Sequence, residues 1–413
     1  MSPDAFFTSR WVDAPAHVRL GAGLPAGFRA SGVKCGIKPS GGPDLGLLVS
    51  SEPQTTSAAR FTRSGVLAAP VLTCMERCDL SALSAIVVNS GNANAATGRR
   101  GLDEAARMQG AGAMAAGVPE TRVGVASTGV IGVQLDGQLI VSGLVEARSE
   151  LAEYGDRAFA EAIRTTDAFP KRASLEVELP SGTVKLAAQA KGAGMISPHF
   201  ATLLCFVETD AALEPETADL LLGVCVKRSF DRISVDGQLS TNDSVFLLAS
   251  GASGVAVTPE SEDELRLGEA LDALLRRLAL LILADGEGSA RVGRVLVTGG
   301  DPDGVERVAR GVANSPLVKA ALNGGDPNWG RIAQAAGAAL PGTAPLALDV
   351  WIEDVQVCGR GMGLPFDAGA LAEAVTKPEV EYAIGLPGTG AEAEVFFSDL
   401  SHEYVRINAE YTS

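Results

Sequence analysis

Short polar clusters follow most of the apolar runs in this chain, and they hold the residues that could do chemistry. Each cluster taken alone is explained as a turn, because glycine, asparagine, aspartate and serine favour turns. Together the clusters exceed what turns require, which makes them candidates for a functional site. They are residues 89–98 (NSGNANAATG), 126–132 (ASTGVIG), 164–167 (RTTD), 191–195 (KGAGM), 234–243 (SVDGQLSTND), 284–288 (ADGEG), 324–332 (GGDPNWGRI) and 407–413 (INAEYTS).

Residues 191–211 place a glycine-rich loop directly before an apolar run, with Ala201 and Thr202 at the join. A threonine hydroxyl is a weak nucleophile, but a free α-amine on the same residue would supply a general base with a near-neutral pKa. Cleavage of the Ala201–Thr202 bond would create both groups at once. Sequence spacing alone, however, favours the simpler interpretation that Thr202 is an ordinary residue at the start of a strand.

Several common catalytic motifs are missing from the sequence. It has no G-x-x-x-x-G-K-[ST] phosphate loop, no H-E-x-x-H, no G-x-S-x-G and no G-x-G-x-x-G that opens a helix after a strand. Cys74 and Cys78 have no second Cys or His pair nearby in sequence, so we interpret them as buried thiols rather than metal ligands. The three histidines are too scattered to suggest a Cys/His or Ser/His pair. The sequence therefore favours a mechanism without a metal.

The composition sets the class of protein. The chain has 413 residues, 46% of them apolar, and a formal net charge of −16. This acidic balance argues against nucleic acid or an anionic membrane as partner, since both require a basic surface.

Residues 274–286 are too short an apolar run to cross a bilayer and indicate a buried helix. The first residues contain no apolar targeting segment, so the expected location is the cytoplasm. Six thinly spread cysteines do not indicate a disulfide framework.

Periodicity predicts alternating strands and helices. We expect helices over 101–117, 138–167, 215–230 and 261–288, the last of them capped by Ser261 with Glu264 three residues on. We expect a hairpin over 173–190 that turns at residues 180–182. Further strands are expected over 45–51, 83–98, 122–132, 202–211, 292–300, 345–354 and 391–400. The pattern predicts an α/β or α+β fold, with a lobe boundary near residues 195–202.

The clusters resemble, in fixed order, the motifs of one enzyme family. From residues 27–49 (GFRASGVKCGIKPSGGPDLGLLV) to the C-terminal INAEYTS, the chain is similar to the ornithine acetyltransferases, the glutamate N-acetyltransferase family of arginine biosynthesis. The resemblance implies an N-terminal-nucleophile fold with two strand layers enclosed by helices. It implies self-cleavage into an alpha chain, 1–201, and a beta chain, 202–413, that begins at the nucleophile Thr202. It further implies a heterotetramer of two alpha and two beta chains.

The same resemblance implies roles for individual residues. Thr128 and Gly129 match the oxyanion-hole pair, and a hydroxyl with a backbone N–H suits a developing negative charge. The residues that match substrate contacts are Thr166, Lys191, Thr202, Glu287, Asn408 and Ser413. The implied reaction passes the acetyl group of N-acetylornithine to Thr202, which releases ornithine, and then to glutamate. No cofactor or metal is expected. Some members also use acetyl-CoA as donor, and the sequence leaves open whether this chain does.

The chain departs from the family pattern beside the implied chemistry. His199 and Phe200 precede the cut, Leu203 stands where methionine is common, and Ser289 begins an altered run after Glu287. These changes remove no implied catalytic group, but they leave acceptor specificity open. The alternatives are a self-processing amidase or aminopeptidase, in which water accepts the acyl group, and a specialised acyltransferase paralogue of secondary metabolism. A non-enzymatic amino-acid-binding or scaffold protein would keep an uncut chain.

Overall fold

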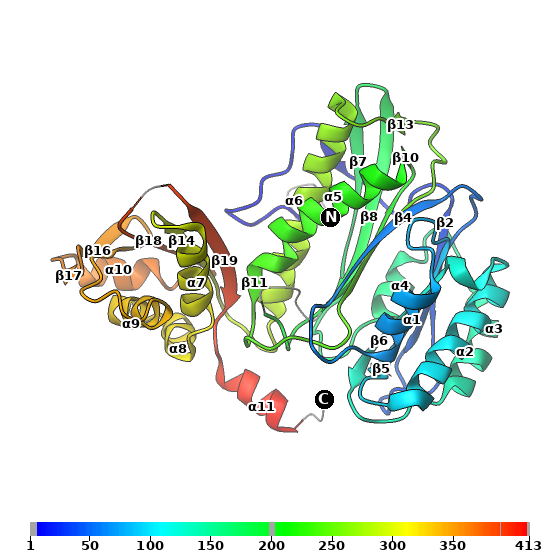
Figure 1. The fold of residues 1–413 in the computed structure, drawn as a ribbon, viewed down its shortest axis with the longest axis horizontal. Coiled ribbons are helices and arrows are strands. Elements are labelled where there is room, and N and C mark those ends of the chain that lie inside the picture. Colours follow the sequence, from blue (N-terminus) through cyan, green and yellow to red (C-terminus); the bar gives the residue numbers. More distant parts are fainter. Residues whose placement is uncertain (1–5, 198–202, 389, 411–413) are drawn as a thin grey trace.

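The body of the protein contains two sheets packed face to face (Figure 1). The computed structural model describes residues 6–197, 203–388 and 390–410. The six-stranded sheet has the order β1 (Val18–Leu20), β7 (Lys171–Leu179), β8 (Gly182–Lys191), β9 (Leu204–Thr209), β12 (Ser244–Ala249) and β4 (Thr56–Phe61). The four-stranded sheet has the order β2 (Phe28–Val33), β3 (Leu45–Ser50), β5 (Ala85–Asn92) and β6 (Val123–Val130).

Side-chain alternation along β9 explains how the sheets pack. Leu204 and Phe206 belong to the core shared with the four-stranded sheet, and the Phe206 ring stacks on Phe246 of β12. Cys205 and Val207 point to the opposite face and join the core beneath the helices. Every residue of β9 is buried. A strand that is apolar on both faces is therefore placed between two hydrophobic layers, as its continuous apolar run predicts.

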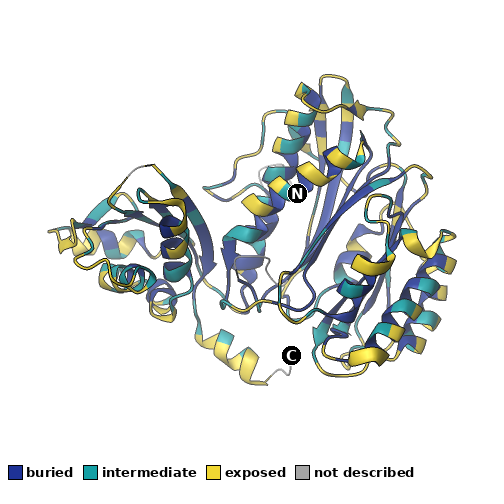
Figure 2. Cartoon of the chain, viewed as in Figure 1, coloured by how far each residue is buried: buried dark blue, intermediate teal, exposed yellow. Residues whose placement is uncertain are grey.

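Helices cover the outer faces of both sheets, which confirms the predicted arrangement of two strand layers enclosed by helices (Figure 1). On the four-stranded side lie α1 (Ala69–Arg77), α2 (Gly98–Ala116) and α3 (Gly137–Ser149). The short helix α4 (Asp156–Ala162) instead packs between the two sheets, where the Phe159 ring lies 5.0 Å from that of Phe206 in β9. On the six-stranded side lie α5 (Pro215–Arg228) and α6 (Glu262–Asp285). The helices bury their inward faces and expose the opposite ones (Figure 2). Ser261 caps α6 as predicted, since its hydroxyl accepts from the Glu264 N–H at 3.1 Å.

A second lobe has a sheet and a core of its own (Figure 1). Its sheet has the order β11 (Ile233–Ser234), β19 (Glu392–Ser398), β14 (Val292–Thr298), β18 (Glu379–Gly385), β15 (Asp349–Ile352), β16 (Val355–Gly359) and β17 (Met362–Gly363). Its helices are α7 (Pro302–Ala313), α8 (Pro316–Gly324), α9 (Trp329–Ala339) and α10 (Ala368–Ala374). The chain then leaves β19 for a separate helix, α11 (His402–Glu410). A two-residue pair, β10 (Ala212–Leu213) with β13 (Ala256–Val257), completes the sheets.

The single helix expected over 138–167 is wrong, because the chain leaves the helical path between α3 and α4. Ala152 exchanges two backbone hydrogen bonds of 3.0 Å with Ala30 of β2. Gly155 sits so close to this bridge that a Cβ there would lie 1.8 Å from the Ala30 carbonyl oxygen. Pairing with a distant strand therefore outweighs the local helical periodicity.

The lobe boundary expected near residues 195–202 is also wrong. β8 and β9, which lie on either side of that segment, are antiparallel neighbours in one sheet, with Lys191 opposite Leu204. The structural boundary instead follows α6, where β14 begins the second lobe. The predicted division into chains 1–201 and 202–413 is a chemical one and stays a prediction. Among the described residues, no helix is long and apolar enough to cross a membrane.

Candidate active site

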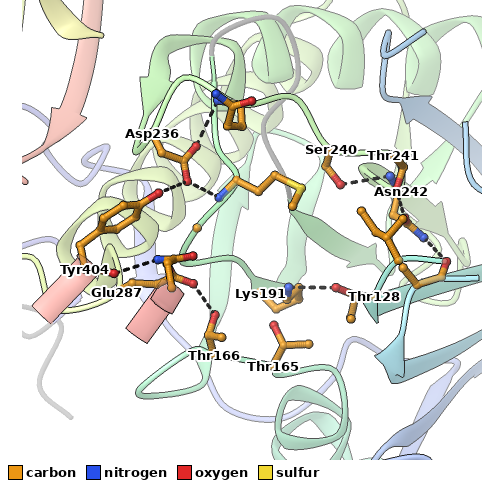
Figure 3. A pocket seen from close by; sticks show the side chains of 17 residues that line it. Thr128, Thr165, Thr166, Lys191, Asp236, Ser240, Thr241, Asn242, Glu287 and Tyr404 are labelled. Carbon is orange, nitrogen blue, oxygen red and sulfur yellow. Dashed lines mark hydrogen bonds between the residues drawn. The ribbon is translucent and has the colours of Figure 1, made fainter. Parts of the chain in front are cut away.

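A pocket of about 160 Å³ lies where β6 and β8 end, and six of the predicted site residues line it (Figure 3). These six are Thr128, Gly129, Thr166, Lys191, Glu287 and Asn408. The remaining lining residues are Ala93, Ile131, Thr165, Gly194, Met195, Asp236, Gln238, Ser240, Thr241, Asn242 and Tyr404. Ala201, Thr202 and Ser413 were also predicted for the site, and they lie outside the described residues. The fold thus gathers side chains from both halves of the sequence around one cavity.

The end of β6 presents a hydroxyl and a glycine to the pocket. Lys191 Nζ donates to Thr128 Oγ1 at 3.0 Å, which leaves the hydroxyl proton of Thr128 free to donate to another acceptor. Gly129 has φ 132°, and a Cβ at this position would lie 2.3 Å from the Gly91 carbonyl carbon of β5. Only glycine fits such a close approach of two strands. Thr128 and Gly129 are therefore fixed by sheet pairing rather than by a flexible turn.

Lys191 supplies the positive charge at the pocket. Its side chain is at the end of β8 and is only 4% exposed. Burial lowers the pKa of Lys191, whereas the nearby carboxylates of Asp167, Asp243 and Glu287 act in the opposite direction. The only side-chain hydrogen bond of Lys191 within the described residues goes to the neutral hydroxyl of Thr128. The ammonium group is thus suited to an anionic ligand group in the pocket.

A buried ionic cluster supports the loop that carries Thr165 and Thr166. Lys171 Nζ donates to Asp167 at 2.7 Å and to Asp285 at 2.5 Å, and all three side chains are buried. Asp167 also accepts from the Gly192 N–H at 2.7 Å. Burial alone would raise the pKa of Asp167, but the charges of Lys171 and Lys191 outweigh it and hold that pKa below its usual range. Asp167 and Asp285 lie in polar clusters of the sequence, whereas Lys171 carries no local sequence signal and was not predicted.

Glu287 connects three segments at the far side of the pocket (Figure 3). Its carboxylate accepts from Thr166 Oγ1 at 2.9 Å and from Asn408 Nδ2 at 2.5 Å. Glu287 follows the end of α6 and has φ 50°, a conformation that a glutamate rarely adopts. A Cβ on Gly194 would lie 2.6 Å from this carboxylate, so a larger residue in the loop after β8 would displace the Glu287 side chain. The pocket therefore sets a carboxylate opposite the ammonium group of Lys191.

Asp236 is a pocket residue whose organising role the sequence analysis missed (Figure 3). It accepts from the backbone N–H groups of Met195, Ile196 and Gln238 at 2.6, 3.0 and 3.1 Å. It also accepts from the Tyr404 hydroxyl of α11 at 3.1 Å. One carboxylate thus holds both the loop that follows β8 and the C-terminal helix. Tyr404 lies 168 residues away in sequence, so spacing could not have predicted this contact.

The chain is held tightly where it re-enters the sheet. Leu203, the first described residue after the predicted cleavage bond, is 1% exposed, and its N–H donates to Asp243 Oδ1 at 2.9 Å. Asp243 is fully buried, and burial raises the pKa of its carboxyl well above the usual value. Leu203 also accepts from the Ser244 N–H at 3.1 Å. Leu203, one of the departures noted in the sequence, is therefore a core residue of the six-stranded sheet.

The arrangement offers a small polar cavity with a cation, a carboxylate and hydroxyl donors. Such a set can bind a zwitterionic molecule of amino-acid size and polarise a carbonyl oxygen. Among the described residues, no group of three or more His, Cys, Asp or Glu side chains is placed to hold a metal ion. All six cysteines are free thiols, and the Cys74 Sγ donates to a backbone carbonyl of β6.

Comparison with known proteins gives the family. The arginine biosynthesis bifunctional proteins ArgJ of Symbiobacterium thermophilum and Nitratidesulfovibrio vulgaris are 40% and 42% identical to this chain. The alignments cover 95% and 94% of this chain and 98% and 99% of those proteins. A solved ornithine acetyltransferase from Mycobacterium tuberculosis, in complex with ornithine, is 35% identical, with a TM-score of 0.41 over 45% of this chain and 99% of its own. The model of the ArgJ family matches residues 29–413, and the chain therefore belongs to the ArgJ family.

Proposed function

We propose that this chain is a self-processing acetyltransferase of arginine biosynthesis that moves an acetyl group from N-acetylornithine to glutamate. Membership of the ArgJ family supports the pathway. The observation that carries the proposal is the pocket itself, which brings Thr128, Gly129, Lys191 and Glu287 together where the loop that leads to the predicted cleavage bond begins.

In the first half-reaction, the hydroxyl of Thr202 attacks the acetyl carbonyl of N-acetylornithine while its own α-amine takes the hydroxyl proton. The hydroxyl of Thr128 and the N–H of Gly129 stabilise the negative charge that develops on the carbonyl oxygen. The C–N bond then breaks, and the proton goes to the leaving α-amine of ornithine. An acetyl ester on Thr202 remains. Lys191 binds the substrate carboxylate throughout, since its ammonium group faces the pocket with a neutral partner.

In the second half-reaction, the α-amine of glutamate attacks the ester carbonyl, and the same oxyanion contacts stabilise the negative charge on the carbonyl oxygen. The ester C–O bond then breaks, a proton of the attacking amine passes by way of the Thr202 α-amine to the departing Thr202 oxygen, and N-acetylglutamate leaves. Hydrolysis of the ester by water must be slower than the attack of this amine. The site must therefore hold the amine next to the ester. Lys191 and Glu287 are suited to that positioning, because they offer opposite charges within one pocket. Acetyl-CoA as a second donor, a heterotetramer of two alpha and two beta chains and a cytoplasmic location are further parts of this proposal.

Mass spectrometry of the purified protein tests the proposal directly. We expect two chains, 1–201 and 202–413, and we expect Thr202→Ala to remain whole. N-acetylornithine alone should add one acetyl group to the 202–413 chain, and glutamate should remove it as N-acetylglutamate. An uncut chain in active protein would refute the processing step. An acetylated chain that water discharges and glutamate does not would instead favour an amidase.

A further inference from the structure

A second cavity, of about 520 Å³, lies at the junction of the two lobes and shares no lining residue with the candidate active site. Four segments that are distant in sequence form it. They are residues 8–10 ahead of β1, the C-terminal half of α6, residues 290–292 at the start of β14, and residues 377–379 at the start of β18. The body and the second lobe therefore both contribute to its walls.

The charges around this cavity differ from those of the rest of the chain. Its lining contains four cationic side chains, Arg10, Arg277, Arg291 and Lys377, and a single carboxylate, Glu379. The whole chain, by contrast, has 34 basic and 50 acidic residues. A concentration of positive charge in an acidic protein indicates a site for a negatively charged ligand.

Three of these four cations form no ion pair within the described residues. Arg10 pairs with Glu353 at 2.8 Å. In the described part of the chain, the Arg291 guanidinium donates only to backbone carbonyl groups, those of Leu322, Asn323 and Thr376. Lys377 is exposed at the cavity rim and has no hydrogen bond to a described residue. The positive charge of the cavity is therefore largely uncompensated.

Arg277 is the most informative of the lining residues. It is 9% exposed, and its guanidinium donates to the Phe6 carbonyl and, at 2.7 Å, to the Thr8 hydroxyl, which are both neutral acceptors. Burial lowers its pKa, and the carboxylate of Glu379 acts in the opposite direction. A buried cation without a carboxylate partner is unfavourable unless some other anion compensates it. The adjoining cavity has the space for such an anion.

We propose that this cavity binds a small multivalent oxyanion, a phosphate or polycarboxylate of metabolite size. Arg277 binds it through the planar donor edge of the guanidinium, and Lys377 binds it from the rim as a point charge. Arg291 adds positive charge beside the ligand, while its guanidinium donates to the carbonyl groups of Leu322 and Asn323 at the end of α8. The ligand bridges both lobes because both line the cavity, and it lies beside the segment that follows Glu287, which contributes Ala290 to the wall.

Titration calorimetry with the full chain tests the site. Sodium phosphate and sodium citrate are each titrated at constant ionic strength, which separates the two ligand sources and removes general screening effects. We expect saturable binding of at least one of them. Arg277→Gln should weaken that binding by about 10-fold or more, because a charge-assisted contact is lost. Lys377→Gln should also weaken it, and this exposed side chain can be changed without disturbing the core.

Arg266→Gln on the same helix is the matched control, because Arg266 forms an exposed pair with Glu262 away from the cavity. Its affinity for the anion should equal that of the unmodified protein. Two results would overturn the inference. The first is that neither anion binds at concentrations up to about 10 mM, above which binding would be too weak to be specific. The second is that Arg277→Gln and Lys377→Gln bind the anion as tightly as the control does. Both results are independent of acetyl transfer and self-cleavage, so they do not depend on the proposed function.

Discussion

Replacing Asp236 by asparagine should slow self-cleavage while leaving the protein folded. The change keeps the size of the side chain but removes its charge and one of its acceptor oxygens. In the unmodified chain, Asp236 accepts from Met195, Ile196 and Gln238 and from the Tyr404 hydroxyl. An asparagine oxygen can still serve Ile196 and Gln238. Its NH₂ group would then face the Met195 N–H, which loses its acceptor.

The magnitude follows from the number of affected bonds. A hydrogen bond to a charged group contributes about 1.5–3 kcal/mol, so one lost bond and two weakened ones cost about 3 kcal/mol. A factor of ten corresponds to about 1.4 kcal/mol, so the ratio of the correctly held to the released loop falls by about 100-fold. Self-cleavage should slow by about the same factor. Ile196 keeps its buried side chain, and its carbonyl still accepts from the N–H of Val235, so the loop remains attached.

The assay is a time course of conversion of the full chain into 1–201 and 202–413 on denaturing gels. Asp263→Asn is the matched control, because the Asp263 carboxylate also accepts from a backbone N–H and a hydroxyl, those of Ser181, and Asp263 does not line the pocket. Tyr404→Phe removes only the contact to α11 and should slow cleavage much less than Asp236→Asn. Wild-type cleavage kinetics in a folded Asp236→Asn protein would refute the reasoning. Equal slowing by Asp263→Asn would show a general loss of stability instead.

Three further predictions concern single groups. Thr128→Ala should lower the turnover of fully processed enzyme by about 10²- to 10³-fold with little change in KM, and near-normal turnover would remove Thr128 from the oxyanion contact. Lys191→Ala should raise KM for both N-acetylornithine and glutamate in steady-state kinetics, because both present a carboxylate, and an effect on only one substrate would contradict a shared site. Burial lowers the pKa of Lys319 to about 7, so this group is protonated in the unfolded chain but largely neutral in the folded one above that pH. Lys319 should therefore raise the free energy of unfolding between pH 7 and 9 by at most about 1.4 kcal/mol per pH unit. In urea unfolding, the Lys319→Met variant should lack this contribution to the increase of the unfolding free energy with pH.

Much of the local structure could be predicted from the sequence, because it depends on neighbouring residues. The Ser261 cap, the hairpin of β7 and β8 and the long apolar strands all follow from short-range spacing, and the structure confirms them. The arrangement of two strand layers enclosed by helices was implied by the resemblance of many motifs to one family. The helix expected over 138–167 was wrong because Ala152 pairs with Ala30, a contact between residues more than a hundred positions apart.

The candidate site shows the same division. The sequence by itself determined which residue types were available, including Thr128, Lys191 and Glu287 at the ends of apolar runs. Only the tertiary structure decided which of these ends meet. Glu287 reaches Thr166 and Asn408 because the end of α6 lies beside two other segments, and Lys171 joins Asp167 to Asp285 beneath them. Local dihedral preferences act over a few residues, whereas sheet register and core packing set distances between segments more than a hundred residues apart, and only packing could therefore assemble the pocket.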